Sequence, residues 1–411
     1  MGGKNMKKPN IVILGAGYGG MMTAVNLQKA IGLNDATITL VNKNDYHYQT
    51  IWLHENAAGT LEQERSRIDI KNILNMQKIK FIKDTVVSIK PKNHKVKLED
   101  GEIDYDYLVI GLGFEAATYG ITGLKENGLM INDLSSARLI REHIEYNFAM
   151  YNQEKDKDQA HLNIVICGGG VTGIEFAGEL VDRIPNLCAE FDINKPQVRV
   201  VMIEEASTIL PGFDQQLIDY TMNSLESRGV EIITEAKVKE CTSASIVYKK
   251  DGEQIEIPTF TTISAAGIRA NRIVEQSGFK MNAGKIEVRQ DMRTLEYNNV
   301  FVVGDCALTS ENNPENLLSP TAQIAIQQAE TVAHNLKTLI KGKGKIVDFQ
   351  PRTIGTVASL GNDDAVGIFM KDRKLFGWKA TVMEKIIDNH YLYKLGGVKL
   401  MIKKGKFNFF Y

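Results

Sequence analysis

The chain has 411 residues, enough at about 150 residues per domain for two or three domains with a sizeable buried core. Hydrophobic residues make up 43% and charged residues 24%, a balance that excludes a disordered, fibrous or integral membrane chain. The net charge of −1 excludes a global field that would attract nucleic acid. The charge is uneven, however, because residues 371–411 are strongly basic and the remaining chain is acidic.

The cysteines and the hydropathy indicate a cellular setting. The four cysteines contain no C-x-x-C pair, which predicts a reducing compartment with no disulfide framework, and no spacing typical of a metal site occurs. No uncharged apolar run reaches the roughly 18 residues that a membrane-spanning helix needs. We therefore expect a protein on the cytoplasmic side without a transmembrane segment.

One pattern occurs twice along the chain. Residues 11–20 have the sequence IVILGAGYGG and residues 164–173 have the sequence IVICGGGVTG. Each is an apolar β-branched run followed by G-x-G-x-x-G and a helix-like segment, and a second β run follows each helix (TITLVN and VRVVMIE). Both copies predict a βαβ unit of a dinucleotide-binding fold.

Later β runs complete these two folds. Strands are expected within residues 105–115 and 259–271 and at FVVGD (301–305), and Ser319-Pro320 is expected to begin a helix that ends near Ile340. The predicted fold class is α/β, with two Rossmann-type domains, the second inserted in the first, and a C-terminal region. The boundaries that we predict are 1–112 and 271–345 for the two parts of the first domain, 113–270 for the second domain, and 346–411 for the C-terminal region.

The first glycine motif suits a dinucleotide. Gly15 permits the tight turn, Gly17 lets the backbone approach a pyrophosphate, and Gly20 allows close helix–strand packing. The acid expected about 20 residues further on is missing, because the strand ends at Asn42-Lys43. This favours FAD over NAD at the first site, and a merely structural glycine turn is the alternative.

The second glycine motif is followed by the acidic residue that the first motif lacks. Gly168, Gly170 and Gly173 repeat the pattern, and the following strand ends at Glu204, whose carboxylate can accept hydrogen bonds from a ribose. A 2′-phosphate would meet like charge at Glu204 and Glu205, so NADH is expected in preference to NADPH. The alternative is a degenerate repeat that is retained for packing.

One flavin-type and one nicotinamide-type fold in the same chain predict hydride transfer from NADH to FAD. Five segments resemble bacterial type II NADH dehydrogenases: GAGYGG, VNKNDYHYQTIWLHENAAGT, GGGVTGIEFAGEL, VVGDC and AQIAIQQ. The resemblance implies a single-subunit respiratory flavoenzyme with non-covalent FAD, which reduces a membrane quinone, either menaquinone or ubiquinone, without pumping protons. It also implies a homodimer attached peripherally to the cytoplasmic face of the cell membrane.

The same resemblance implies particular contacts. Asp305 would bind the ribityl chain of FAD, although an acid that ends a strand can also serve only as a cap. Asn42 and Lys43 would contact the adenosine, and the backbone of Val86 the adenine. The further contacts implied are Ala16, Tyr18, Gly19 and Ala322 for FAD and Gly267 for NADH.

Three residues are predicted to act on the quinone that accepts the electrons. Gln323 and Gln327 lie four residues apart on one helix face, where Ala322 leaves room for a flat ring, and their amides can donate to quinone carbonyls. A packed Gln/Ala-rich helix is the alternative. Glu175, in the first turn of the second dinucleotide helix, is the candidate proton donor or quinone-positioning residue. It could equally orient the nicotinamide or complement the helix dipole.

The histidines and the C-terminal tail each have two possible interpretations. His47 and His54 are interpreted as structural, with contact to the flavin as the alternative. The basic, aromatic tail favours adsorption to an anionic membrane, and a dimer contact is the alternative. Because both glycine motifs precede it, we expect removal of residues 375–411 to leave flavin reduction intact.

Competing functions are a sulfide:quinone reductase, another NAD(P)H-dependent flavoprotein, and an NADH-binding membrane flavoprotein without quinone turnover.

Overall fold

A five-stranded parallel sheet forms the centre of the first dinucleotide fold. The computed structural model describes residues 8–265, 267–282, 284–310, 317–352, 355–361, 363–370 and 373–407. The strands of this sheet are β1 (Asn10–Leu14), β2 (Thr37–Asn42), β5 (Ile79–Lys83), β9 (Tyr107–Ile110) and β22 (Val300–Val302). Their order is β22-β9-β1-β2-β5. The apolar runs are continuous because both faces of the sheet are covered.

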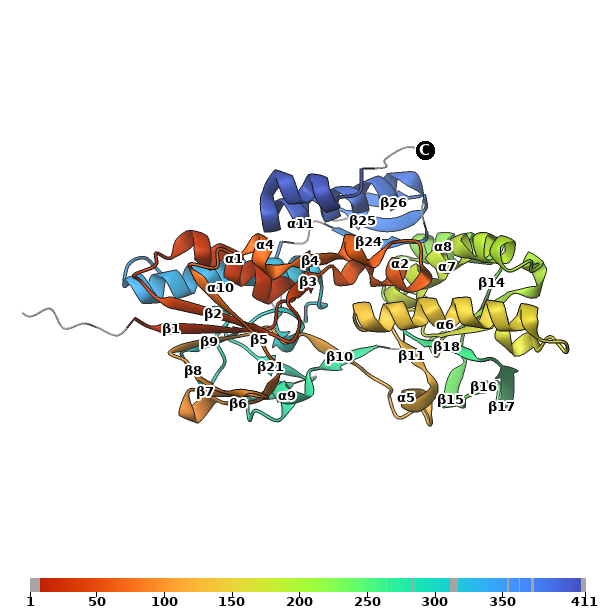
Figure 1. Ribbon diagram of the computed structural model, residues 1–411, viewed down its shortest axis with the longest axis horizontal. Helices are drawn as coiled ribbons and strands as arrows, with labels where there is room; N and C mark the ends of the chain where they lie inside the picture. The colour runs from red at the N-terminus through yellow and green to blue at the C-terminus, as the bar shows by residue number, and fades with distance from the viewer. Residues whose placement is uncertain are drawn as a thin grey trace, which may run out of the picture.

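Helices cover one face of this sheet (Figure 1). Helix α1 (Tyr18–Ala30) follows β1 and packs against α10 (Ala322–Lys341). An antiparallel sheet lies on the other side, made of β6 (Val86–Lys90), β7 (Lys95–Leu98) and β8 (Gly101–Asp104). The predicted helix near residues 320–340 is therefore confirmed, but its cap is Thr321 and not Ser319, because the Thr321 hydroxyl accepts from the Ile324 N–H.

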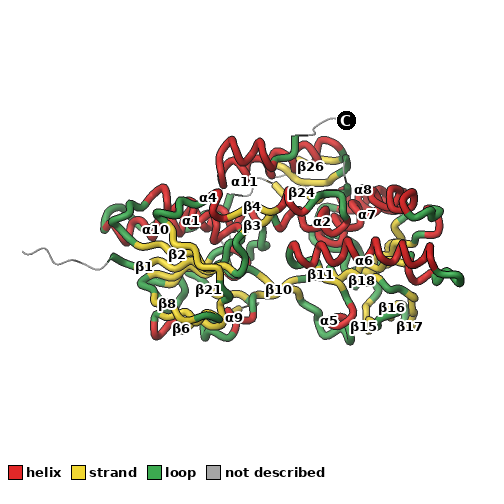
Figure 2. The backbone as a smooth tube through the Cα atoms, viewed as in Figure 1, coloured by secondary structure: helices red, strands yellow, loops and turns green. Residues whose placement is uncertain are grey.

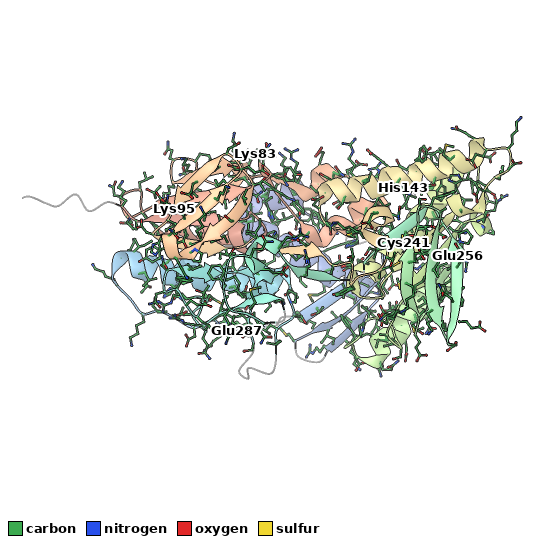
Figure 3. The ribbon with its side chains drawn as sticks, turned by 90° about the horizontal axis from the view of Figure 1, so that it is seen from below. Lys83, Lys95, His143, Cys241, Glu256 and Glu287 are labelled. Atoms are coloured by element: carbon green, nitrogen blue, oxygen red, sulfur yellow. The ribbon has the colours of Figure 1, made fainter. Side chains whose placement is uncertain are left out.

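The second dinucleotide fold repeats this plan. Its parallel sheet has the order β11-β18-β12-β13-β14, and the strands are β11 (Leu129–Met130), β12 (Asn163–Cys167), β13 (Arg199–Ile203), β14 (Val230–Ile233) and β18 (Thr261–Ser264). The helices are α6 (Leu134–Gln153), α7 (Val171–Glu190) and α8 (Gln215–Ser227), and the antiparallel sheet is β15 (Lys237–Cys241), β16 (Ser245–Lys250) and β17 (Glu253–Pro258). Cys241 and Glu256 of that small sheet lie in the other half of the molecule from Lys83 and Lys95 of the first fold (Figure 3).

The strand order shows the insertion. The chain leaves the first sheet after β9, builds the second sheet and returns at β22, which pairs with β9. The two crossings, β10 (Phe114–Ala116) and β19 (Ile268–Ala270), pair antiparallel with each other. The α/β fold class with one Rossmann-type fold inserted in another is thus confirmed, while the exact boundaries at residues 112, 270 and 345 stay predictions.

Short elements complete the chain. They are β3 (Tyr46–Tyr48), η1 (Thr50–Trp52), α2 (Leu53–Ala58), α3 (Gln63–Ser66), β4 (Arg67–Asp69), α4 (Ile70–Ile73), η2 (Pro91–Asn93), α5 (Leu124–Asn127), η3 (Gln159–His161), η4 (Lys195–Gln197), α9 (Arg272–Glu275), β20 (Met281–Asn282), β21 (Lys285–Glu287), η5 (Gly304–Cys306) and β23 (Ala307–Leu308). Helix α2 packs against both α6 and α7, so this segment of the first fold reaches the second.

The C-terminal region lies across both folds, as Figures 1 and 2 show. It consists of β24 (Gly355–Ser359), β25 (Ala365–Phe369), β26 (Arg373–Phe376) and α11 (Trp378–Lys404), which kinks at Gly396 and Gly397. A side chain at Gly178 of α7 would collide with the backbone of Leu360, so this region packs closely on the second fold. No helix among the described residues is long and apolar enough to cross a membrane.

Helix α11 is also part of the core of the first fold. Tyr391, Leu392 and Leu395 belong to the same hydrophobic cluster as β1 and α1, and the Trp52 Nε1 donates to Asp388 over 2.6 Å. Removal of residues 375–411 would therefore also remove part of the core of the first fold, which the basic composition of the tail concealed. The expectation that flavin reduction survives this removal stays a prediction.

This packing predicts the effect of truncating one side chain of α11. Leu392 is fully buried, so Leu392→Ala should lower the free energy of unfolding by about 2–5 kcal/mol. Ile402, on the same helix, is 66% exposed, and Ile402→Ala should change it by no more than about 0.5 kcal/mol. Thermal unfolding of the two variants tests this, and equal melting temperatures would show that α11 is only loosely attached.

Candidate functional site

The first glycine loop forms an open turn between β1 and α1. Gly15 has φ +90°, and a side chain there would collide with the carbonyl of Gly111. A side chain at Gly20 would collide with the carbonyl of Gly15, which explains the close packing of helix on strand. At Gly17 an added Cβ would meet nothing within 4 Å, and no side chain caps α1 there. The helix N-terminus therefore has space and uncapped N–H groups for an anionic group.

The residue that replaces the missing acid holds this loop. Asn42 Oδ1 accepts from the Ala16 N–H over 2.9 Å, and Asn42 Nδ2 donates to the Asn44 carbonyl over 2.8 Å. Lys43 is exposed and lies 3.5 Å from Asp133, while Val86 is buried at the start of β6. The adenosine contacts of Asn42, Lys43 and Val86 stay predictions, but the structure adds a role for Asn42 in shaping the loop.

Asp305 lies in η5, the single turn that follows β22. Burial raises the pKa of its carboxyl, and Lys285 opposes this shift. Both residues line a small pocket with Thr321 and Gln328 of the α10 segment. Gln328 was missed by the sequence analysis although it follows Gln327 directly; its Oε1 accepts from the Gly304 N–H over 2.7 Å and so fixes η5.

The two predicted quinone ligands differ in their surroundings. Gln327 Oε1 accepts from the Arg352 N–H over 2.8 Å, and its Nε2 donates to the Arg352 carbonyl over 3.0 Å. The amide of Gln327 is thus occupied by the chain that leads to the C-terminal region. Gln323 is partly exposed near the start of α10, beside Ala322. Gln323 is consequently the better candidate of the two for binding an acceptor.

The second glycine loop has the same construction as the first. Gly168 has φ +110°, a side chain at Gly173 would collide with the Gly168 carbonyl, and an added Cβ at Gly170 would meet nothing within 4 Å. Glu204, at the end of β13, accepts from the Gly169 N–H over 2.6 Å and from the Ala206 N–H over 2.7 Å. Glu204 thus takes the structural place that Asn42 has in the first fold, and it adds a charge.

Glu175 lies in the first turns of α7, close to the first fold. Its Oε2 is 3.4 Å from Nδ1 of His54, a buried residue of α2. Burial, followed by the charge of Glu384, raises the pKa of Glu175 well above its usual range. Burial also lowers the pKa of His54 to about 3, so this histidine is neutral near pH 7. A neutral, proton-carrying Glu175 is the form that the structure favours.

Glu175 belongs to a largely buried cluster of ionisable residues that the sequence analysis did not find. Lys406, beyond the end of α11, pairs with Glu55 of α2, and its Nζ lies 3.6 Å from Asp388 and 4.8 Å from the centre of the Trp52 ring. Burial raises the pKa values of Glu179 and Glu384 to about 8 each. Three regions of the chain supply these groups, so no local motif could reveal the cluster.

The cysteines have no reactive thiolate. Burial raises the pKa of Cys306 to about 12, and the pKa of Cys167 is raised further by the same cause. All four cysteines are free and buried. A protonated, inaccessible thiol is a poor nucleophile, and this disfavours sulfide chemistry at Cys306 beside Asp305.

Comparisons with known proteins agree with this construction. Residues 9–329 match the family model of the pyridine nucleotide-disulphide oxidoreductases. The type II NADH:quinone oxidoreductase of Staphylococcus aureus strain MSSA476 is 40% identical over 400 residues, which cover 97% of this chain and 99% of the relative. The protein of the same name from strain NCTC 8325 is 39% identical over the same shares.

Two solved structures share the fold. The NDH2 of Plasmodium falciparum in complex with NADH has a TM-score of 0.86 at 19% identity and covers 96% of each chain. The sulfide:quinone oxidoreductase of Aquifex aeolicus has a TM-score of 0.76 at 22% identity and covers 94% of this chain and 91% of that one. At these identities the likeness concerns the fold alone. The sequence relatives decide the family: the chain belongs to the pyridine nucleotide-disulphide oxidoreductases and, among them, to the type II NADH:quinone oxidoreductases.

Proposed function

We propose that the chain oxidises NADH at the second glycine loop and passes two electrons, by way of FAD at the first loop, to a membrane quinone. The observation that carries this proposal is the pair of similar loops, of which only the second ends in an acid that can bind a ribose. The bound flavin supplies the redox chemistry, since it accepts a hydride and donates electrons to a quinone. The protein residues bind, orient and supply protons.

The residues present fit FAD at the first loop. The uncapped end of α1 and the free space at Gly17 suit a pyrophosphate. Gln49 is fully buried, yet neither its Oε1 nor its Nε2 has a hydrogen-bond partner among the described residues. An unpaired buried amide costs about 1–3 kcal/mol, so a bound molecule that pairs with it stabilises the site. Asp305 is the acid that we propose for the ribityl hydroxyls.

NADH preference is assigned to Glu204. Its two hydrogen bonds to backbone N–H groups fix the carboxylate beside the second loop, where Gly170 leaves space for a pyrophosphate. A 2′-phosphate next to this carboxylate would meet like charge. Gly267, near the end of β18, stays a predicted NADH contact.

The variant Glu204→Gln removes the charge and keeps only one of the two acceptor oxygens, so it also loses one of the two hydrogen bonds to the backbone. The Michaelis constant for NADH should rise about tenfold or more, since hydrogen bonds to charged groups contribute about 1.5–3 kcal/mol, and NADPH should be discriminated against less. Stopped-flow bleaching of the flavin by NADH and by NADPH measures both effects. Glu231→Gln is the control because Glu231 is exposed on β14 and pairs with Arg199 at the start of β13. An unchanged NADH preference in Glu204→Gln would remove the role of this residue.

The acceptor half-reaction needs protons as well as electrons. We assign Gln323 to a quinone carbonyl and Glu175 to positioning the ring or supplying a proton. Glu179 and Glu384 lie near Lys406, adjoin Glu175 and can restore that proton. Carboxyls with raised pKa values are protonated near neutral pH, and this is the state that a proton donor requires.

The sign of the pH dependence follows from these shifts. Flavin reoxidation by quinone should slow as the pH rises through about 8, where Glu179 and Glu384 lose their protons. Glu175→Gln should slow the same step by roughly 10²-fold or more and leave bleaching by NADH nearly normal. Double-mixing stopped flow with a soluble quinone separates the steps, and Glu190→Gln, at the exposed end of α7, is the control. Slowed bleaching with normal reoxidation would instead assign Glu175 to the nicotinamide.

We also propose that α11 binds the cytoplasmic face of the cell membrane. Its inner face is buried in the first core, whereas Ile386, Tyr393, Val398 and Ile402 are exposed together with lysines. Exposed apolar residues that alternate with lysines are typical of a helix lying in an anionic interface. This position brings the enzyme to its lipophilic acceptor. The homodimer stays a prediction from the family resemblance.

Acidic substitutions on the exposed apolar face test the membrane assignment. Val398→Glu and Ile402→Glu should reduce sedimentation with vesicles that contain anionic lipid, and added salt should weaken binding of the wild type only in part. Ile255→Glu, on the exposed edge of β17 far from α11, is the control and should bind normally. Normal sedimentation of the α11 variants, with intact activity toward soluble quinone, would rule this face out as the membrane surface.

A further inference from the structure

Three aromatic rings connect α11 to the first glycine loop. Tyr18 is the first residue of α1, His47 lies in β3, and Tyr391 lies in α11; all three are buried. The ring centres of Tyr18 and Tyr391 are 4.7 Å apart in an edge-to-face arrangement, and those of Tyr18 and His47 are 5.5 Å apart. Tyr391 therefore lies directly against the residue that begins the helix of the loop.

The hydrogen bonds of His47 have only one possible direction. Nδ1 is 2.8 Å from the Ala16 carbonyl oxygen, which can only accept, so Nδ1 carries the proton and donates. Burial lowers the pKa of His47 to about 4, so the ring is neutral near pH 7 and Nε2 has a free lone pair. The Tyr391 hydroxyl, 2.8 Å from Nε2, must then be the donor. The chain of bonds runs from Tyr391 through His47 to Ala16.

The Ala16 residue is held on both sides by side chains. Its N–H donates to Asn42 Oδ1, and its carbonyl accepts from His47 Nδ1. These bonds fix the peptide planes between Gly15 and Gly17, where a bound pyrophosphate would meet the backbone. Orientation of a binding loop before the ligand arrives strengthens binding because less ordering is needed afterwards.

We propose that Tyr391 is a positioning residue for FAD, which acts through His47 on the Ala16 peptide and so makes α11 part of the FAD site. This inference rests on the proposed placement of FAD at the first loop. It also gives a reason why the helix that we assign to the membrane is joined to the core of the first fold: the same helix supports the cofactor from its buried face.

The measured quantity is the rate at which the purified holoenzyme releases FAD, followed as the rise of free flavin fluorescence after dilution. Tyr391→Phe keeps the ring and removes the donor, which leaves the Nε2 lone pair buried and unpaired. We expect release to be about tenfold faster while the far-ultraviolet circular dichroism stays unchanged. Tyr393→Phe, on the exposed face of the same helix, should release FAD at the wild-type rate.

A double-mutant cycle separates this role from general packing. His47→Asn retains a nitrogen donor at the δ position, toward Ala16, and lacks the Nε2 that Tyr391 contacts. In the His47→Asn background, Tyr391→Phe should therefore change FAD release by less than about twofold. His47→Leu, which removes both nitrogens, should release FAD faster than His47→Asn does. Excess FAD should restore the activity of Tyr391→Phe toward soluble quinone.

Asn42→Ala distinguishes the possible failures. If Asn42→Ala accelerates FAD release and Tyr391→Phe does not, the role of Tyr391 is wrong and the placement of FAD stands. If neither variant changes release, FAD does not bind this loop and both proposals fail. If Tyr391→Phe lowers the melting temperature at an unchanged release rate, Tyr391 is only a packing residue and the inference is overturned.

Discussion

Helix α11 and the residues that follow it are held against the first dinucleotide fold by buried polar interactions, and the geometry of the site depends on them. Trp52 donates to Asp388, Lys406 pairs with Glu55, and Tyr391 donates to His47. These bonds join segments more than 300 residues apart in the chain. Removing one partner of a buried charged pair is costly, since the other charge stays behind without compensation. The C-terminal region is for this reason a constituent of the folded core and cannot be regarded as an appended anchor.

The same contacts explain why the two faces of α11 differ, one buried in the protein interior and the other exposed at the surface. The inner face of α11 supplies carboxylates and a phenol to the interior, where low dielectric keeps Glu384 protonated near neutral pH and the His47 ring neutral. The outer face supplies apolar residues and lysines to the surface. A lipophilic acceptor that arrives through the outer face would find proton-carrying groups directly behind it.

The two glycine loops show how a repeated fold takes on two tasks. In both, a side chain at the end of the second strand accepts from the N–H that follows the first glycine. In the first fold that side chain is the neutral Asn42, and in the second it is the charged Glu204. The loop geometry is thus preserved while the charge at the ribose position differs. The exchange of an amide for a carboxylate is the difference on which we base the proposed assignment of FAD to the first loop and NADH to the second.

Sequence alone determined the parallel sheets, both glycine loops, the insertion of one fold in the other and the family resemblance, because these depend on local periodicity and on motifs of fewer than about 20 residues. The relatives confirm the resulting function. From the sequence, the cap of α10 was predicted two residues too early, and Gln327 and Gln323 were predicted equally as quinone ligands. The sequence also showed no sign that residues 375–411 pack into the core of the first fold. Tertiary structure alone decided that Gln327 is occupied by Arg352, that Glu175 joins a cluster around Lys406, and that Tyr391 reaches His47. Such long-range pairs have no signature in a local pattern, since they exist only once packing brings distant segments together and removes water from between them.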